Sequence, residues 1–357
     1  MRAIARVLLA GTGLLFTAAT RGEVTRTLSA EIPEGARAGF AVENLVGTMR
    51  VVVGSGDTVV VGATVHAESQ SLADQVRLDR QTAGSVTTIS VRYPEGTHAL
   101  RYHQEGDGGE VFDFFSAGES HHYRGRSFRL SRSHGTLLYV DLEIQIPARI
   151  SVGQFRNLVG RLEADGVQGK LSFEVESADL KLERLGGALS LHGTSGDIEA
   201  SEISGDWSSE FTSGDCQITG FHGGTLAIKT TSGDIEAREI SADRIRIRAT
   251  SGDTSVEDAD VAELETRSTS GNIDFEERTN RLTRAQIQAT SGDAHLRLPP
   301  DAVFQAEAGF DSGDFHMGYR DAAVTARGER HMTGQRGTGG ARIEVETTSG
   351  NIDIDPR

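Results

Sequence analysis

The sequence predicts an all-β fold, a parallel β-solenoid of about ten coils of 18–21 residues each, with a less regular β cap at its N-terminal end. A short phrase, Thr-Ser-Gly-Asp-Ile, is complete at residues 194–198 and 231–235 and recurs with small changes through the C-terminal two thirds. A fixed period of this size is typical of stacked, similar units. On both sides of the phrase apolar and polar residues alternate, as half-buried strands require. The phrase is centred on Gly160, Ala178, Gly196, Gly214, Gly233, Gly252, Gly271, Gly292, Gly313 and Gly350.

Each unit is interpreted as two strands joined by a corner. In the unit centred on Gly233, Leu226 and Ile228 precede the phrase, and Ile235 and Ala237 follow it. A period of two places the members of each pair on one face of a strand. Glycine tolerates a positive φ, and Asp and Ser side chains can hydrogen-bond to nearby backbone, so the phrase suits a corner. We therefore expect apolar side chains to point inward and each coil to pair with the coils above and below.

Composition supports an aliphatic sheet core and excludes some partners. Aromatic residues make up 6% of the 357 residues, so Val, Ile, Leu and Ala are expected to fill the core. The formal net charge of −16 argues against nucleic acid and anionic membranes as partners. Cys216 is the only cysteine, which excludes an intramolecular disulfide. It lies two residues after a phrase centre, an inward position, so we expect a buried structural thiol.

Residues 1–20 are expected to be a signal peptide. Arg2 and Arg6 precede an apolar run over residues 7–19 that ends in small residues, with cleavage expected near Ala19 or Thr20. An uncleaved membrane anchor is the alternative, although the run is short for a bilayer span. No later stretch is long and apolar enough to cross a membrane. The protein is thus expected to be exported and to be periplasmic, on the cell surface or secreted, without an integral span after signal removal.

Two further regions are predicted: residues 22–150, an N-terminal β cap with the first coils, and residues 151–357, the regular solenoid. Around Gly47 the coil register is already present, because Val42 and Met49 occupy inward positions. Alternating runs at 58–65, 86–91 and 137–146 predict further strands of the cap.

An irregular insertion is expected at residues 94–135, where no period of two is visible. Long segments without secondary structure inside compact domains are often functional, and aromatic and arginine side chains favour recognition surfaces. The insertion is therefore either a lid over the end of the solenoid or a partner-binding loop. His103, His121, His122 and His134 match no metal-ligand spacing, so no metal site is expected. The candidate partner-binding residues are Phe112, Phe114, Phe115, His121, His122, Tyr123, Arg124 and Phe128.

A second insertion is predicted at residues 319–340, because the last two phrase centres are 37 residues apart. The pattern resumes at Ile343 and Val345. The final strand carries alternating acids and ends at Pro356, which suits an exposed last edge of the stack.

One acidic position recurs directly after the phrase centre. Stacked carboxylates one coil apart would repel by roughly 0.9 kcal/mol in water, so something must offset the repulsion. Backbone N–H groups within each turn are one explanation, and a bound cation such as Ca²⁺ is the other. Asn272 and Asn351 occupy the same position without charge and favour the first. The turn column is therefore expected to be structural, without metal or cofactor: Asp197, Asp215, Asp234, Asp253, Asp293 and Asp314.

The Ser-Gly-Asp-Ile repeats, the strand that ends at residues 142–147 and the secretory N-terminus together resemble the bacterial putative adhesin domain family. The resemblance covers residues 38–355. It implies an extracytoplasmic β-solenoid with an adhesive or envelope-associated role, and it supplies no catalytic residues.

The function expected from the sequence is that of a non-enzymatic, exported cell-envelope protein, an adhesin-like binding or scaffold solenoid. Its expected partner is an envelope component, either a glycan or a protein, and not a nucleic acid. Two alternatives remain: a polysaccharide-acting β-helix enzyme, and a rod that self-associates end to end. Neither a catalytic residue nor a cofactor-binding motif is found in the sequence.

Overall fold

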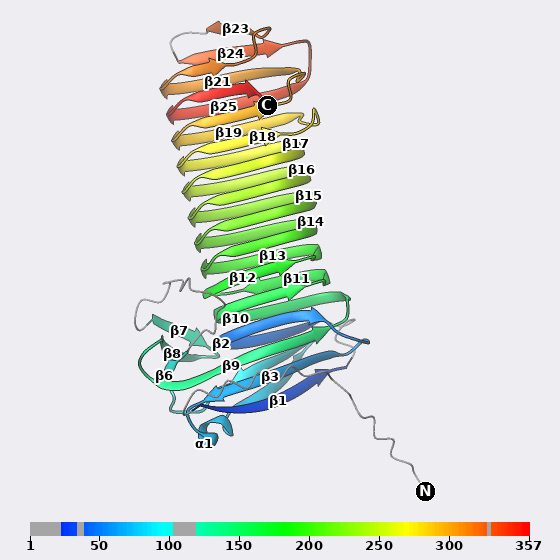
Figure 1. The fold of residues 1–357 in the computed structure, drawn as a ribbon, viewed down its shortest axis with the longest axis vertical. Helices are drawn as coiled ribbons and strands as arrows, with labels where there is room; N and C mark the ends of the chain where they lie inside the picture. The colour runs from blue at the N-terminus through cyan, green and yellow to red at the C-terminus, as the bar shows by residue number, and fades with distance from the viewer. Residues whose placement is uncertain (1–22, 34–38, 103–118, 327–329) are drawn as a thin grey trace.

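The computed structural model describes residues 23–33, 39–102, 119–326 and 330–357. The protein is a parallel β-solenoid in the form of a long rod, with a wider β cap at its N-terminal end, which confirms the predicted fold class (Figure 1). The one helix in the described ranges, α1, is a single turn over Gln70–Ala73. Within these ranges no helix is long and apolar enough to cross a membrane.

The regular coils stack strand on strand, because each strand pairs in parallel with the strands one coil before and after it. In this register Cys216, Ile235 and Thr254 lie above one another, and all three are buried. Full burial of an Ile side chain stabilises a fold by about 1.5–3 kcal/mol, so the inward columns hold the rod together. The strands are β10 (Arg149–Asp165), β11 (Gln168–Glu174), β12 (Ser177–Glu183), β13 (Gly186–Ser195), β14 (Ile198–Ser213), β15 (Cys216–Ser232), β16 (Ile235–Ser251) and β17 (Thr254–Ser270).

The Ser-Gly-Asp corners need glycine for two reasons. The φ angle of Gly233 is +116°, in the region that side chains disfavour. A Cβ atom at Gly233 would also overlap the carbonyl oxygen of Gly214, which lies one coil below. The corners therefore stack backbone on backbone, and this close approach brings successive coils into register.

Replacing Gly233 by Ala is expected to destabilise the protein by roughly 2–4 kcal/mol, since the strained φ and the overlap with Gly214 add. Gly56→Ala is the matched control, because Gly56 has φ +93° but open space around its Cβ position. It should cost only about 1 kcal/mol. Urea unfolding of both variants measures the difference, and equal losses would contradict the close approach of the corners.

The cap closes the base of the rod with an antiparallel sheet of β1 (Val24–Ile32), β3 (Val59–Ala67) and β9 (Thr136–Ile146). His66 joins these strands. Its Nδ1 lies 2.7 Å from Glu23 Oε1 and its Nε2 lies 3.1 Å from Asp141 Oδ2, and its ring stacks on Tyr139. Burial alone would lower the pKa of His66, but Asp141 and Glu23 together raise it above its ordinary value.

The junction between cap and rod is formed by β2 (Phe40–Val53), which already lies in coil register. Gly47 pairs with Gly160 of β10, and on its other side β2 pairs in parallel with β9 and with β5 (Val86–Arg92). The hairpin partner of β5 is β4 (Arg77–Ala83). At this junction the buried Asn44 donates to Asn157 Oδ1, and both side chains donate to backbone carbonyls. Tyr93 donates to Asn44 Oδ1 at 2.9 Å. A satisfied polar network therefore fixes where the cap meets the rod.

The expectation of an irregular insertion over residues 94–135 needs correction in its described part. Three strands occur there: β6 (Ala99–Arg101), β7 (Glu119–Tyr123) and β8 (Arg126–Ser131). β7 and β8 form an antiparallel hairpin. β6 pairs in parallel with β8 and also with β9, so it links the hairpin to the rest of the cap. The alternation escapes notice in the sequence because one strand turns a histidine and a tyrosine inward, types that are common on surfaces.

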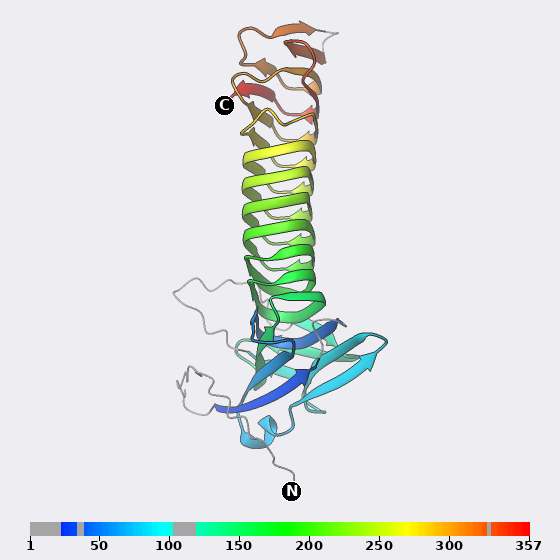
Figure 2. The same ribbon diagram turned by 90° about the vertical axis from the view of Figure 1, so that its right-hand side faces the viewer.

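The expectation that the last strand forms an exposed edge is wrong, because the C-terminal coil lies inside the stack. β25 (Ala341–Ser349) pairs with both β19 (Arg284–Ser291) and β21 (Phe304–Ser312). β26 (Ile352–Pro356) likewise lies between β20 (Ala294–Leu298) and β22 (Phe315–Met317). The coil around Gly350 is thus inserted between those around Gly292 and Gly313, and the C-terminus lies below the end of the rod (Figure 2). The remaining strand of this region, β18 (Ile273–Glu277), pairs with β17 and β20.

The distal end of the rod is closed by antiparallel strands from the segment predicted as a second insertion, residues 319–340. β24 (His331–Arg336) pairs with β21, and β23 (Ala323–Ala326) pairs with β24. Antiparallel strands thus cover the base of the solenoid and the β21 edge at its distal end, and they protect these edges from pairing with other chains.

Candidate functional site

The acidic turn column links successive coils. Asp197 Oδ1 accepts the backbone N–H of Asp215 at 2.8 Å, and Asp215 Oδ1 accepts that of Asp234 at 2.8 Å. The bonds therefore run between coils and not within a turn, which corrects the expected geometry. The column continues through the inserted coil in the order in which the coils are stacked. The backbone N–H of Asn272 donates to the Asp253 side chain, and the N–H of Asp293 donates to the Asn272 side chain. The N–H of Asn351 then donates to Asp293, and the N–H of Asp314 donates to Asn351.

This column is a ladder of side-chain to backbone bonds. Asn can replace Asp in this ladder, because each coil needs only one side-chain oxygen to accept the backbone N–H of the next coil. Among the described residues, no three His, Cys, Asp or Glu side chains are grouped as ligands of a metal ion.

Of the candidate partner-binding residues, Phe112, Phe114 and Phe115 lie outside the described residues. His121, Tyr123 and Phe128 are buried, which corrects their placement on a recognition surface. The Tyr123 hydroxyl donates to the carbonyl of Val91 at 2.9 Å, and Phe128 packs edge-on against a neighbouring tyrosine. Only His122 and Arg124 of the described set are exposed. The hairpin thus contributes mainly to the core of the cap.

His121 and Cys216 are buried in different surroundings. His121 Nδ1 lies 2.8 Å from Glu176 Oε2, which joins the hairpin to the solenoid. Cys216 is also buried, and burial raises the pKa of its thiol to about 12. Because the thiolate is the reactive form, this cysteine is inert at neutral pH.

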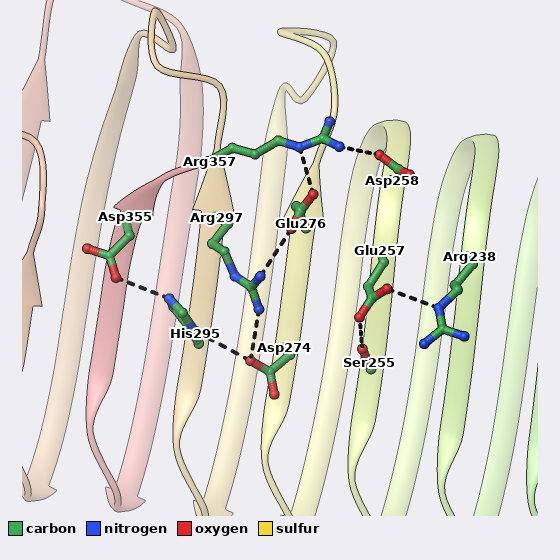
Figure 3. A network of polar contacts seen from close by, with 10 residues as sticks. All are labelled: Arg238, Ser255, Glu257, Asp258, Asp274, Glu276, His295, Arg297, Asp355 and Arg357. Atoms are coloured by element: carbon green, nitrogen blue, oxygen red, sulfur yellow. Dashed lines mark hydrogen bonds and ion pairs between the residues drawn. The ribbon is translucent and has the colours of Figure 1, made fainter.

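One flank of the distal coils carries a network of ion pairs that reaches across several strands (Figure 3). Arg297 contacts Glu276 at 3.1 Å and Asp274 at 3.7 Å, and His295 contacts Asp355 of the inserted coil at 3.1 Å. Each carboxylate of Figure 3 faces an arginine or histidine side chain, so the network suits cohesion of the coils. Exposed pairs of this kind contribute only about 0–1 kcal/mol each.

A groove of about 750 Å³ lies on the other side of the turn column from this ion-pair network. It crosses the five most distal coils, a length of about 19 Å at one strand spacing per coil. Its floor follows the position three residues before each central glycine. In four of the five coils this position carries a small side chain that is less than a tenth exposed, and in the coil of Gly313 it carries Phe310. The four small residues are Ala249, Ser268, Ala289 and Thr347.

The two walls of the groove differ in chemistry. One wall bears Arg248 and Arg267, and the other bears a row of exposed threonines, Thr269, Thr290 and Thr348. The groove ends at Phe310 and at Arg330, which pairs with Asp311 at 3.2 Å. Hydroxyl, guanidinium and one aromatic group thus face a rigid floor made of paired strands.

This groove was not predicted from the sequence. Its end is built by Arg330, directly before the covering strand β24, and by the coil that lies out of sequence order, and neither can be read from the repeat. The residue type three positions before the corner gives no signal either, because a threonine stands there both outside the groove, at Thr230, and inside it, at Thr347.

A smaller cavity of about 170 Å³ lies at the other corner of the distal coils and is lined in part by Glu277. Glu277 is fully buried and occupies the column in which Ala259 stands one coil below. Its Oε1 accepts from the Thr279 hydroxyl at 3.2 Å, whereas its Oε2 has no hydrogen-bond partner in the described structure. Burial raises the pKa of Glu277 to about 8, so this side chain is an acid at neutral pH.

The sequence profile of the Toastrack DUF4097 family matches residues 170–355, which is more than half of the chain. No curated protein matches the sequence of this chain. Among solved structures, a putative adhesin from Parabacteroides distasonis aligns at 11% identity over 77% of this chain and 97% of its own, with a TM-score of 0.41.

Two other solved structures are more distant in TM-score. A putative adhesin from Parabacteroides merdae has 13% identity, covers 77% of this chain and 95% of its own, and has a TM-score of 0.30. A putative cell adhesion protein from Clostridium sporogenes has 10% identity, covers 94% of this chain and 100% of its own, and has a TM-score of 0.21. At these values the likenesses carry no functional conclusion.

Proposed function

The chain belongs to the Toastrack DUF4097 family, and on that premise we propose that it is an exported, non-enzymatic scaffold of the cell envelope that binds an envelope component. The observation that carries the proposal is the groove of about 750 Å³ on a rigid face of the rod. Binding sites on regular elements keep their geometry better than sites on loops. The signal-like residues 1–20 support export, although they lie outside the described residues.

The groove supports binding better than catalysis. Its two acidic side chains are both engaged: Asp311 pairs with Arg330, and Glu346 accepts from Gln288 at 3.0 Å. Glu277, with its raised pKa, lines a different cavity. A cleavage site for polysaccharides needs two carboxyl groups that flank one bond, and the groove does not offer such a pair.

The test is cosedimentation of the purified protein with cell-envelope fractions, with the supernatant assayed for released sugar ends. Pelleting without release of sugar supports the proposal. Protein that stays in the supernatant would refute envelope binding, and steady release of sugar ends would favour the polysaccharide-acting enzyme.

End-to-end self-association is a separate expectation, and the same preparation tests it. Among the described strands β23 pairs only with β24 and β22 pairs only with β26, so free edges of four and three residues remain at the distal end. Edges this short favour a monomer. Light scattering at increasing protein concentration should therefore report a constant mass, and growth of the mass would support rods that join end to end.

A further inference from the structure

We infer that the groove binds an extended polysaccharide that carries carboxylate groups, such as a polymer of uronic acids. This inference rests on the proposed function and gives it a ligand class. The groove is long, shallow and polar, and it follows the rod axis, so it suits a chain molecule that meets one coil after another.

Local positive charge in an acidic protein is the first argument. Arg248 and Arg267 each lie 3.5 Å from the same oxygen of Glu265, and Arg246 lies 3.6 Å from its other oxygen. Three guanidinium groups thus share one carboxylate in a chain of net charge −16. The side chains of Arg248 and Arg267 are 60% and 47% exposed. They can therefore turn to a ligand carboxylate, which a guanidinium binds in a two-pronged geometry.

Hydroxyl groups are the second argument. Thr269, Thr290 and Thr348 form an exposed row with one hydroxyl per coil along the wall opposite the arginines. A regular row of donors and acceptors suits the hydroxyls of a sugar chain. Phe310, half-buried at the end of the groove, offers one apolar surface on which a sugar ring can pack.

A peptide is a poorer fit for this groove. Peptides add to a free strand edge or place side chains in apolar pockets. The floor strand β19 pairs on one side with β17 and on the other with β25, and β25 pairs in turn with β21, so no edge is free there. Of the lining residues only Phe310 is aromatic. A single-stranded nucleic acid is also a poorer fit, because its bases stack on several aromatic side chains and the groove lining offers only one.

The experiment measures binding of oligogalacturonate, a uronic acid polymer, to the purified full-length protein by calorimetry. The blocking variant is Thr290→Trp, which places a large side chain in the groove wall. Its matched control is Thr231→Trp, the same corner position in a coil that does not line the groove. We expect about tenfold weaker binding by Thr290→Trp and unchanged binding by Thr231→Trp.

Charge is tested with the double variant Arg248→Gln, Arg267→Gln, and Arg238→Gln on the opposite flank is the control. The double variant should bind about tenfold more weakly and lose most of the salt dependence of the wild type. Equal affinity for neutral pullulan, or equal binding by Thr290→Trp and wild type, would overturn the inference.

Different results would refute this inference and the proposed function. Wild-type protein that pellets with envelopes but does not bind oligogalacturonate would refute the ligand class alone. Envelope binding that survives periodate oxidation of sugars and is abolished by proteinase K would identify a protein partner and also overturn the inference. Protein that does not pellet at all would refute the proposed function.

Discussion

Ile235→Asp should destabilise the protein by roughly 4 kcal/mol or more, because it places an unpaired carboxylate in the core between two coils. Ile235 is 2% exposed and pairs in register with Cys216 below and Thr254 above. Neither neighbour brings a cation, so nothing offsets the burial of charge. Urea unfolding followed by circular dichroism measures the loss, with the midpoint moving far to lower denaturant.

The next residue along the strand supplies the control. Glu236 points outward and pairs with Arg238 on the surface, so Glu236→Lys should cost less than about 1 kcal/mol. Similar losses in the two variants would mean that the inward and outward faces are wrongly assigned.

Glu277→Gln should stabilise the protein at alkaline pH and change it little near pH 4.5. Folding raises the pKa of Glu277 from 4.5 to about 8, so between these values the folded state keeps a proton that the unfolded state has released. Stability therefore falls as pH rises through this window, by up to roughly 4–5 kcal/mol in all. The Gln variant lacks this titration. At pH 9 it should be the more stable protein by about 2–4 kcal/mol, since an amide still accepts from the Thr279 hydroxyl.

The measurement is a series of urea unfolding curves from pH 4.5 to pH 9 for both proteins. The pKa of His66 is also raised, so its contribution is lost as pH rises, but this affects both proteins and cancels in their difference. Glu276→Gln is the control, because Glu276 lies beside Glu277 yet pairs with Arg297 and Arg357 on the surface. A difference between wild type and Glu277→Gln that stays constant with pH would contradict the buried acid.

The solenoid was predictable because its signals are local. Alternation around each corner identifies inward residues such as Ile235 and Ala237, and the structure buries both. The corner glycine follows from the same phrase, as Gly233 shows with its positive φ and its contact with Gly214. Each of these features depends on a few neighbouring residues, so the sequence contains enough to predict it.

The order of the last coils was not predictable, because parallel coils share one pattern. Ile343 pairs with Ala285 on one side and Ala306 on the other. All three positions are small or aliphatic, and the pattern would accept either order of stacking. The surface placement of His121, Tyr123 and Phe128 was wrong for a related reason. Aromatic residues such as Tyr123 and Phe128 are equally common on recognition surfaces and in buried hairpins. Only tertiary contacts, such as the hydrogen bond from the Tyr123 hydroxyl to the Val91 carbonyl, distinguish the two placements.

The inserted coil also constrains the route by which the chain folds. Residues 304–317 are synthesised before residues 341–356, and they carry the same corner chemistry, so they can dock first onto β19 and β20. The native arrangement requires that place to stay open, or to be vacated, until β25 and β26 arrive. Growth of the rod is therefore sequential only up to Gly292, and its completion depends on a competition between two segments for one template.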